Sequence, residues 1–214
     1  MISRWLAGLL GCALVAAAGA ADAPLYENDF EKTEPGKLPE ELLVLGGEFA
    51  VKRDGTNQFL ELPGAPLDSY GALFGPAEKE DVSVSARILG TAKGRRAPSF
   101  GLGLGGAGGW KLQVAPGKKT VELLKDQEAK ASVPFEWKSG EWAQLRLQVR
   151  KPKDGEWKIE GKVWPRGTAE PKDWTISVGE PEEPIAGKAA LLGSPFSGTP
   201  IGFDDLRVEK LPVK

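Results

Sequence analysis

The stretch Ala143-Gln144-Leu145-Arg146-Leu147-Gln148-Val149-Arg150 decides the fold class, because apolar and polar residues alternate along it without a break. Successive side chains of a strand point to opposite faces of a sheet, so this pattern predicts a strand with one buried and one polar face. The stretches Val82–Ile88 and Trp110–Val114 repeat it. Burial on one face only is typical of antiparallel sheets.

Shorter runs with a strand-like composition extend this pattern along the chain. They are Glu48–Lys52, Gln58–Leu62, Phe100–Leu104, Thr120–Leu124, Lys158–Trp164, Lys188–Leu192 and Gly202–Val208. Asp54-Gly55 and Asp154-Gly155 are dipeptides that favour hairpin turns. No segment shows a helical period. Many short strands with turn signals between them predict an all-β sandwich or jelly roll.

The composition agrees with this fold class and excludes several kinds of chemistry. The 214 residues include 28 Gly and 17 Pro, which suit strands joined by turns, and the length suits one domain over residues 21–214. With no His and a single Cys, the chain has no Ser-His-Asp or Cys-His catalytic system, no internal disulfide and no thiolate zinc cluster. A net charge of −2 offers no broad basic surface to nucleic acid or to anionic lipid.

Residues 1–20 have the features of a secretory signal peptide. Arg4 precedes an apolar run, and Ala18-Gly19-Ala20 fits the rule of small residues at a cleavage site. The run is too short for a comfortable membrane span, and no second candidate follows. Leu9-Leu10-Gly11-Cys12 resembles a bacterial lipobox, but few apolar residues precede Cys12 and the run continues past it. We therefore favour cleavage over a lipid anchor at Cys12, and expect a secreted or periplasmic protein.

Several segments, taken in order, resemble concanavalin A-like and laminin G-like jelly rolls of secreted bacterial proteins. They are Asn28-Asp29-Phe30-Glu31 with Pro35-Gly36, Gly140-Glu141-Trp142, Gly161-Lys162-Val163-Trp164, Glu170-Pro171 with Trp174, and the ending Gly202-Phe203-Asp204-Asp205-Leu206-Arg207-Val208. The resemblance implies an antiparallel jelly-roll sandwich of two sheets, one of them curved with a concave face that often binds glycans. It implies no single activity, because lectins, glucanases and adhesion modules share this fold.

Two tryptophans are predicted to lie on a polar sheet face. Residues separated by an even number of positions on a strand share a face, so Trp142 lies with Gln144 and Arg146, and Trp164 with Lys162. Trp110 and Trp157 share their faces with apolar residues and are predicted to belong to the core. Sugar rings present apolar C–H faces that stack on Trp, while Arg and Gln bind hydroxyl groups. The candidate ligand-binding residues are Trp142, Trp164, Arg87, Gln113, Gln144 and Arg146. The same set also suits a solvated outer sheet.

Glu27, Asp29 and Glu31 form a Glu-x-Asp-x-Glu pattern that resembles the catalytic strand of laminarinase-like glucanases. Alternation would place these three carboxylates on one face of a strand, as a retaining mechanism needs. The glucanase motif, however, lies in mid-chain and has an apolar residue where this sequence has Asn28, so we assign no catalytic residue. The resemblance also suggests a structural calcium ion where the first and last strands meet, with Asp29, Asp204 and Asp205 as candidate ligands.

These observations favour a non-catalytic module that binds carbohydrate or a component of the cell envelope. Two alternatives stay open. One is a glycoside hydrolase or lyase that uses carboxylates on the same fold, and the other is a structural or adhesion module whose tryptophans are all buried. In addition, Lys93-Gly94-Arg95-Arg96 forms a basic loop that suits either solvent or an acidic sugar or sulfate.

Overall fold

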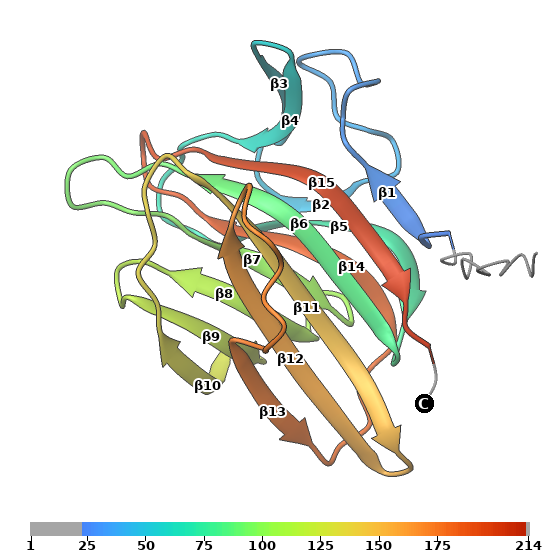
Figure 1. Ribbon diagram of the computed structural model, residues 1–214. Helices are drawn as coiled ribbons and strands as arrows, with labels where there is room; N and C mark the ends of the chain where they lie inside the picture. Colours follow the sequence, from blue (N-terminus) through green and yellow to red (C-terminus); the bar gives the residue numbers. More distant parts are fainter. Residues whose placement is uncertain (1–22, 213–214) are drawn as a thin grey trace, which may run out of the picture.

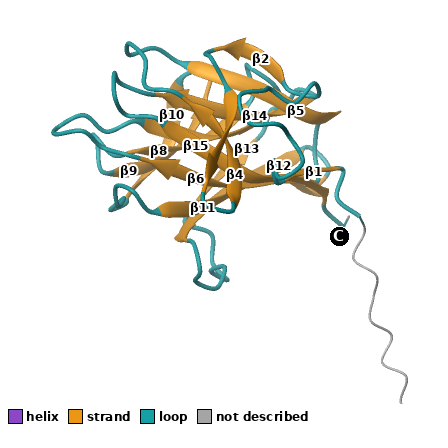
Figure 2. Ribbon diagram, turned by 90° about the horizontal axis from the view of Figure 1, so that it is seen from above, coloured by secondary structure: helices purple, strands orange, loops and turns teal. Residues whose placement is uncertain are grey.

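The computed structural model describes residues 23–212, which form two antiparallel β-sheets packed face to face (Figures 1 and 2). This architecture confirms the predicted all-β sandwich. The described residues contain no helix that could cross a membrane. The predicted signal segment and Cys12 lie outside the described residues.

One sheet, here called the β11 sheet, has eight strands. In spatial order they are β13 (Ile176–Glu180), β12 (Glu156–Pro165), β11 (Trp142–Lys153), β6 (Val82–Gly90), β15 (Ile201–Lys210), β4 (Asn57–Leu62) and β3 (Ala50–Asp54), with β1 (Tyr26–Asn28) pairing with β15. The last strand, β15, therefore lies between β4 and β6 and also holds the first strand. This pairing of first and last strands agrees with the jelly-roll expectation.

The other sheet, here called the β8 sheet, has seven strands. In spatial order they are β10 (Glu128–Pro134), β9 (Thr120–Lys125), β8 (Trp110–Ala115), β7 (Ser99–Leu104), β14 (Gly187–Ser194), β5 (Tyr70–Glu78) and β2 (Leu43–Gly46). Every strand predicted from alternation or composition is present, with its ends shifted by a few residues.

The core lies between the two sheets and is made by the apolar positions of the alternating strands. Leu145 and Leu147 of β11 are fully buried, as is Leu112 of the opposing β8. Trp110 and Trp157, at 3% and 8% exposure, belong to the same core, as predicted. Gly161 faces Leu112, and a Cβ added there would lie 2.5 Å from Leu112 Cδ1, so this glycine lets the sheets approach each other.

Candidate functional site

The outer face of the β11 sheet brings together five of the six predicted ligand-binding residues. Gln144 on β11 lies opposite Arg87 on β6 and Trp164 on β12, and residues directly opposite each other share a face. Trp142 and Arg146 have the parity of Gln144 on the same strand. The sixth residue, Gln113, was wrongly placed with them, because it lies on β8 in the other sheet.

Arg87 occupies the centre of a buried polar cluster on this face. Its Nη2 donates hydrogen bonds to Asp204 Oδ2 at 2.5 Å and to Asn57 Oδ1 at 2.6 Å, and its Nε lies 2.8 Å from Asp205 Oδ2. The Trp142 ring covers the guanidinium, 4.9 Å from its central carbon. Arg87 is 5% exposed, so it positions Trp142 and β15 and is not free to bind a ligand directly.

The carboxyl group of Asp204 is fully buried beneath Arg87. Burial raises the pKa of Asp204 to about 6, although hydrogen bonding from Asn57 and the charge of Arg87 act in the opposite direction. In the unfolded chain the pKa of an Asp is about 3.9. Between these two values the folded state binds more protons than the unfolded state, so Asp204 lowers the free energy of unfolding as the pH rises from about 4 to about 6.

We therefore expect Asp204→Asn to remove this part of the pH dependence. In urea unfolding experiments, the stability of the wild type relative to that of Asp204→Asn should fall as the pH is raised from 4 to 6 and then stay level. Asp173→Asn is the matched control, because Asp173 is exposed and forms no ion pair or side-chain hydrogen bond within residues 23–212, so its substitution should leave the pH profile in place. Parallel profiles for the wild type and Asp204→Asn would show that Asp204 does not titrate in this range.

The segment that follows β12 folds back over another part of the outer face. Glu170 forms ion pairs with Lys162 at 2.9 Å and with Arg146 at 3.0 Å. The Lys162 ammonium also donates to the carbonyl of Pro171 at 2.8 Å and lies 4.3 Å from the centre of the Trp174 ring. These contacts bury Lys162 and engage Arg146 in structural pairs, which parity alone could not indicate.

Four aromatic side chains surround a small hollow of about 100 Å³ at one end of the sandwich. We call it the aromatic hollow, and it is lined by Phe135, Trp137, Trp142 and Trp164, with Glu136, Lys138 and Glu141 among its polar residues. Trp164 is almost completely buried, whereas Phe135, Trp137 and Trp142 are half-buried. The two tryptophans predicted to lie on a polar face therefore meet here, together with two aromatic residues that the sequence analysis did not single out.

The segment from Phe135 to Lys138 also lines a second hollow of about 440 Å³, here called the side hollow. Its other lining residues are Ala97, Pro116 and Lys119. In Figure 1 the segment between β10 and β11 rises along the left side of the molecule, next to the loop between β6 and β7. Two hydrogen bonds join these segments, from Ala92 N to Ser139 Oγ at 2.8 Å and from Gly140 N to Gly90 O at 2.9 Å. The two hollows thus lie on either side of one aromatic segment.

The carboxylates of Glu27, Asp29 and Glu31 do not share one strand face, because β1 ends at Asn28. The buried Phe30 has a φ of 58°, which turns the chain after the strand. Glu27 pairs with Arg207 at 3.3 Å, Asp29 accepts a hydrogen bond from the backbone N–H of Glu31, and Glu31 accepts one from Gln58 N–H. Each of these groups therefore has a structural partner, and the predicted arrangement on one strand face was wrong.

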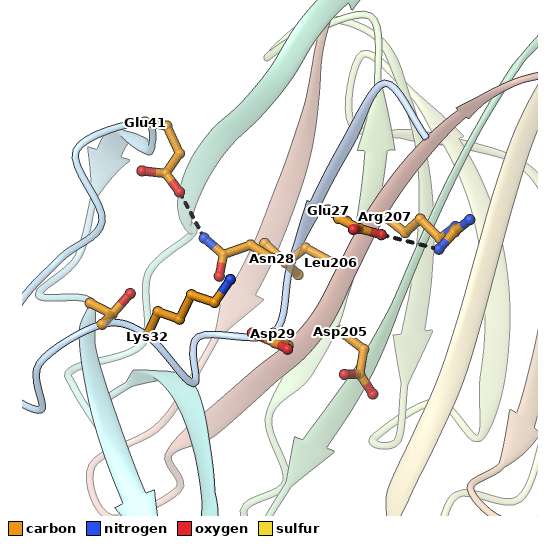
Figure 3. Close-up of a pocket in the computed structure, with 9 residues that line it drawn as sticks. Glu27, Asn28, Asp29, Lys32, Glu41, Asp205, Leu206 and Arg207 are labelled. Atoms are coloured by element: carbon orange, nitrogen blue, oxygen red, sulfur yellow. Dashed lines mark hydrogen bonds and ion pairs between the residues drawn. The ribbon is translucent and has the colours of Figure 1, made fainter. Parts of the chain in front are cut away.

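Glu27 and Asp29 line a larger hollow of about 590 Å³ beside β15 (Figure 3). Of the three predicted calcium ligands, Asp29 and Asp205 lie in this hollow, while Asp204 points to Arg87 on the sheet. Within residues 23–212, no group of three or more His, Cys, Asp or Glu side chains is arranged to hold a metal ion. The three aspartates predicted as ligands are thus not gathered at one point.

Comparison with solved structures identifies the fold. Carbohydrate binding module CBM66 from Bacillus subtilis is 11% identical and has a TM-score of 0.56, with 79% of this chain and 95% of that chain covered. For the carbohydrate recognition domain of Emp46p, in its metal-free form, the identity is 12%, the TM-score 0.59 and the two coverages 88% and 98%. Lectin II from Ulex europaeus is 12% identical and has a TM-score of 0.52, with 89% of this chain and 100% of that chain covered.

The chain therefore has a concanavalin A-like jelly-roll fold, shared with carbohydrate-binding modules and lectin domains, as the sequence resemblance implied. No protein-family model matches the sequence, and no curated protein matches it. At such low identity the likeness defines the fold and leaves the function to be argued from the site.

Proposed function

We propose that the protein is an exported, non-catalytic module that binds carbohydrate at the aromatic hollow and on the adjoining outer face of the β11 sheet. The observation that carries this proposal is the gathering of the half-buried Phe135, Trp137 and Trp142 around one hollow. Aromatic rings of this kind offer apolar surface to the C–H faces of a sugar ring, and Gln144 lies beside Trp142 with no side-chain hydrogen bond to any residue in the described range.

The stacking surface is held in place before a ligand arrives. Trp142 is fixed on one side by the Arg87 guanidinium and on another by Phe59, whose ring meets it edge-on at 5.6 Å and 82°. Trp137 packs in a similar way against Phe100, at 6.1 Å and 63°. Because these rings lose little further freedom on binding, more of the interaction energy remains as affinity.

Binding without catalysis is favoured over the hydrolase alternative by the state of the carboxylates. The one carboxylate pattern that resembles a catalytic motif belongs to β1 and the turn after it. Glu27 pairs with Arg207, Asp29 accepts a hydrogen bond within the turn, and Glu31 accepts one from Gln58 N–H. The purely structural alternative requires every Trp to be buried, and Trp137 and Trp142 are not. The lectins and carbohydrate-binding modules of the same fold provide support by analogy only.

A glycan array probed with the purified protein, with and without EDTA, tests the proposal. We expect selective binding to one group of glycans. Loss of binding with EDTA would show that binding needs a divalent cation, and equal binding would show that it does not. An array with no binding in either condition would contradict the proposed function and favour the structural or adhesion module.

A further inference from the structure

Four basic side chains without partners occur in the chain segments that line the two hollows or adjoin those that do. They are Arg95, Arg96, Lys119 and Arg166, all exposed, and within residues 23–212 none of them forms an ion pair or a side-chain hydrogen bond. Elsewhere many of the basic residues are paired. Lys125, for example, binds both Glu180 and Glu182 at 2.8 and 2.9 Å. Unpaired lysines also occur elsewhere in the described residues, as at Lys32 and Lys37, so what distinguishes this group is its place in or next to the segments that line the hollows.

Three chain segments bring these cations to the hollows. Arg95 and Arg96 directly precede Ala97, which lines the side hollow, and Lys119 lines that hollow itself. Arg166 follows Pro165, which lines the aromatic hollow, and Arg166 N–H donates to the carbonyl of Trp142 at 3.0 Å. Lys119 thus lines the side hollow, while Arg95, Arg96 and Arg166 belong to segments that adjoin the lining residues.

The acidic groups at this end do not balance the cations. Glu122 is buried and pairs with Lys118 at 3.1 Å, and Glu141 lies 3.8 Å from Lys138. Glu136 is the remaining acidic residue among those lining the two hollows. The lining of the two hollows is balanced, with Lys119 and Lys138 against Glu136 and Glu141, so the excess of positive charge comes from the adjoining Arg95, Arg96 and Arg166. Such an excess attracts anions toward the aromatic rings.

We propose that the ligand is an anionic polysaccharide, whose sugar rings stack on Trp137 and Trp142 while its carboxylate or sulfate groups meet Arg95, Arg96, Lys119 and Arg166. This inference rests on the proposed function and adds the charge class of the glycan. Arginine suits both anions, because its planar guanidinium can donate two parallel hydrogen bonds to a carboxylate or a sulfate.

Calorimetric titration with polygalacturonate and with its fully methyl-esterified form tests the charge requirement on one sugar backbone. Heparin and desulfated heparin provide the corresponding pair for sulfate. We expect at least tenfold tighter binding of the more highly charged member of one pair, and a clear weakening of that binding between 50 and 500 mM NaCl, since salt screens exposed charges. The pair that shows the difference identifies the anionic group.

A double variant tests which basic residues bind the anionic groups of the glycan. Arg95→Gln/Arg96→Gln should weaken binding of the anionic glycan at least fivefold, whereas the control Lys32→Gln/Lys37→Gln removes two exposed, unpaired charges from another part of the surface and should leave it unchanged. Equal affinity for the two members of each pair would overturn this inference while leaving carbohydrate binding intact. Equal weakening by the two double variants would overturn the assigned location. Absence of binding to every glycan would overturn the proposed function as well.

Discussion

Replacing Arg87 by methionine is expected to lower the free energy of unfolding by about 3–5 kcal/mol near neutral pH, because it leaves the buried Asp204 carboxylate without its charge partner. The loss should become smaller below pH 6, where Asp204 takes up a proton and no longer buries a charge. Urea unfolding at pH 7.5 and pH 5 measures both effects.

Arg207→Met is the matched control for this variant. Arg207 also forms ion pairs with two acidic residues, Glu27 and Glu209, but its side chain is 41% exposed. Exposed pairs contribute about 1 kcal/mol or less, so the control should be nearly as stable as the wild type at both pH values. Equal effects of the two substitutions would contradict the view that the Arg87 cluster organises the outer face.

Phe203→Ala should lower the free energy of unfolding by a similar amount, about 3–5 kcal/mol, for a different reason. Phe203 precedes Asp204 on β15, but its side chain points to the other face of the sheet, where it is fully buried against Phe49. The loss is one of core packing, so it should be the same at pH 5 and pH 7.5. Urea unfolding at these two pH values distinguishes it from Arg87→Met.

Phe203→Leu keeps most of the buried volume and should cost clearly less than Phe203→Ala. A loss below about 1 kcal/mol for Phe203→Ala would mean that the core around β15 is loosely packed. Such a result would contradict the close packing of the two sheets around Phe203, which holds β15 in place.

The strands that alternation predicts most directly are those with one apolar and one polar face, whereas strands buried on both faces, such as β7, are predicted from their apolar composition and the turns beside them. β11 and β6 alternate because one face of each meets the core, and Trp142 and Trp164 could be assigned to the polar face for the same reason. Two edge strands, β2 and β10, carry weaker signals, because β2 has four residues and β10 has mostly exposed ones. β5 was missed because Gly75, with a φ of 67°, and Pro76 interrupt its alternation.

The candidate site was predictable only in part, because parity gives the face of a strand but not the sheet to which the strand belongs. Gln113 has a polar-face parity and still lies in the β8 sheet. Alternation also does not predict which side chains contact one another, so the burial of Arg87 against Asp204 and Trp142 could not be predicted from the sequence. Phe135 and Trp137 lie between β10 and β11, in a segment with no period, and only the fold brings them to Trp142.

Titration of the glycan that binds best on the array, with wild type, Trp142→Ala and Trp137→Ala, tests carbohydrate binding at the aromatic hollow most directly. Trp157→Phe is the control, since Trp157 is a core tryptophan at the opposite end of β12. Circular dichroism identifies any variant that fails to fold. We predict that each alanine variant stays folded and binds at least tenfold more weakly, a loss of about 1.4 kcal/mol, while Trp157→Phe binds as the wild type does. Wild-type affinity in both folded alanine variants would contradict binding at this hollow.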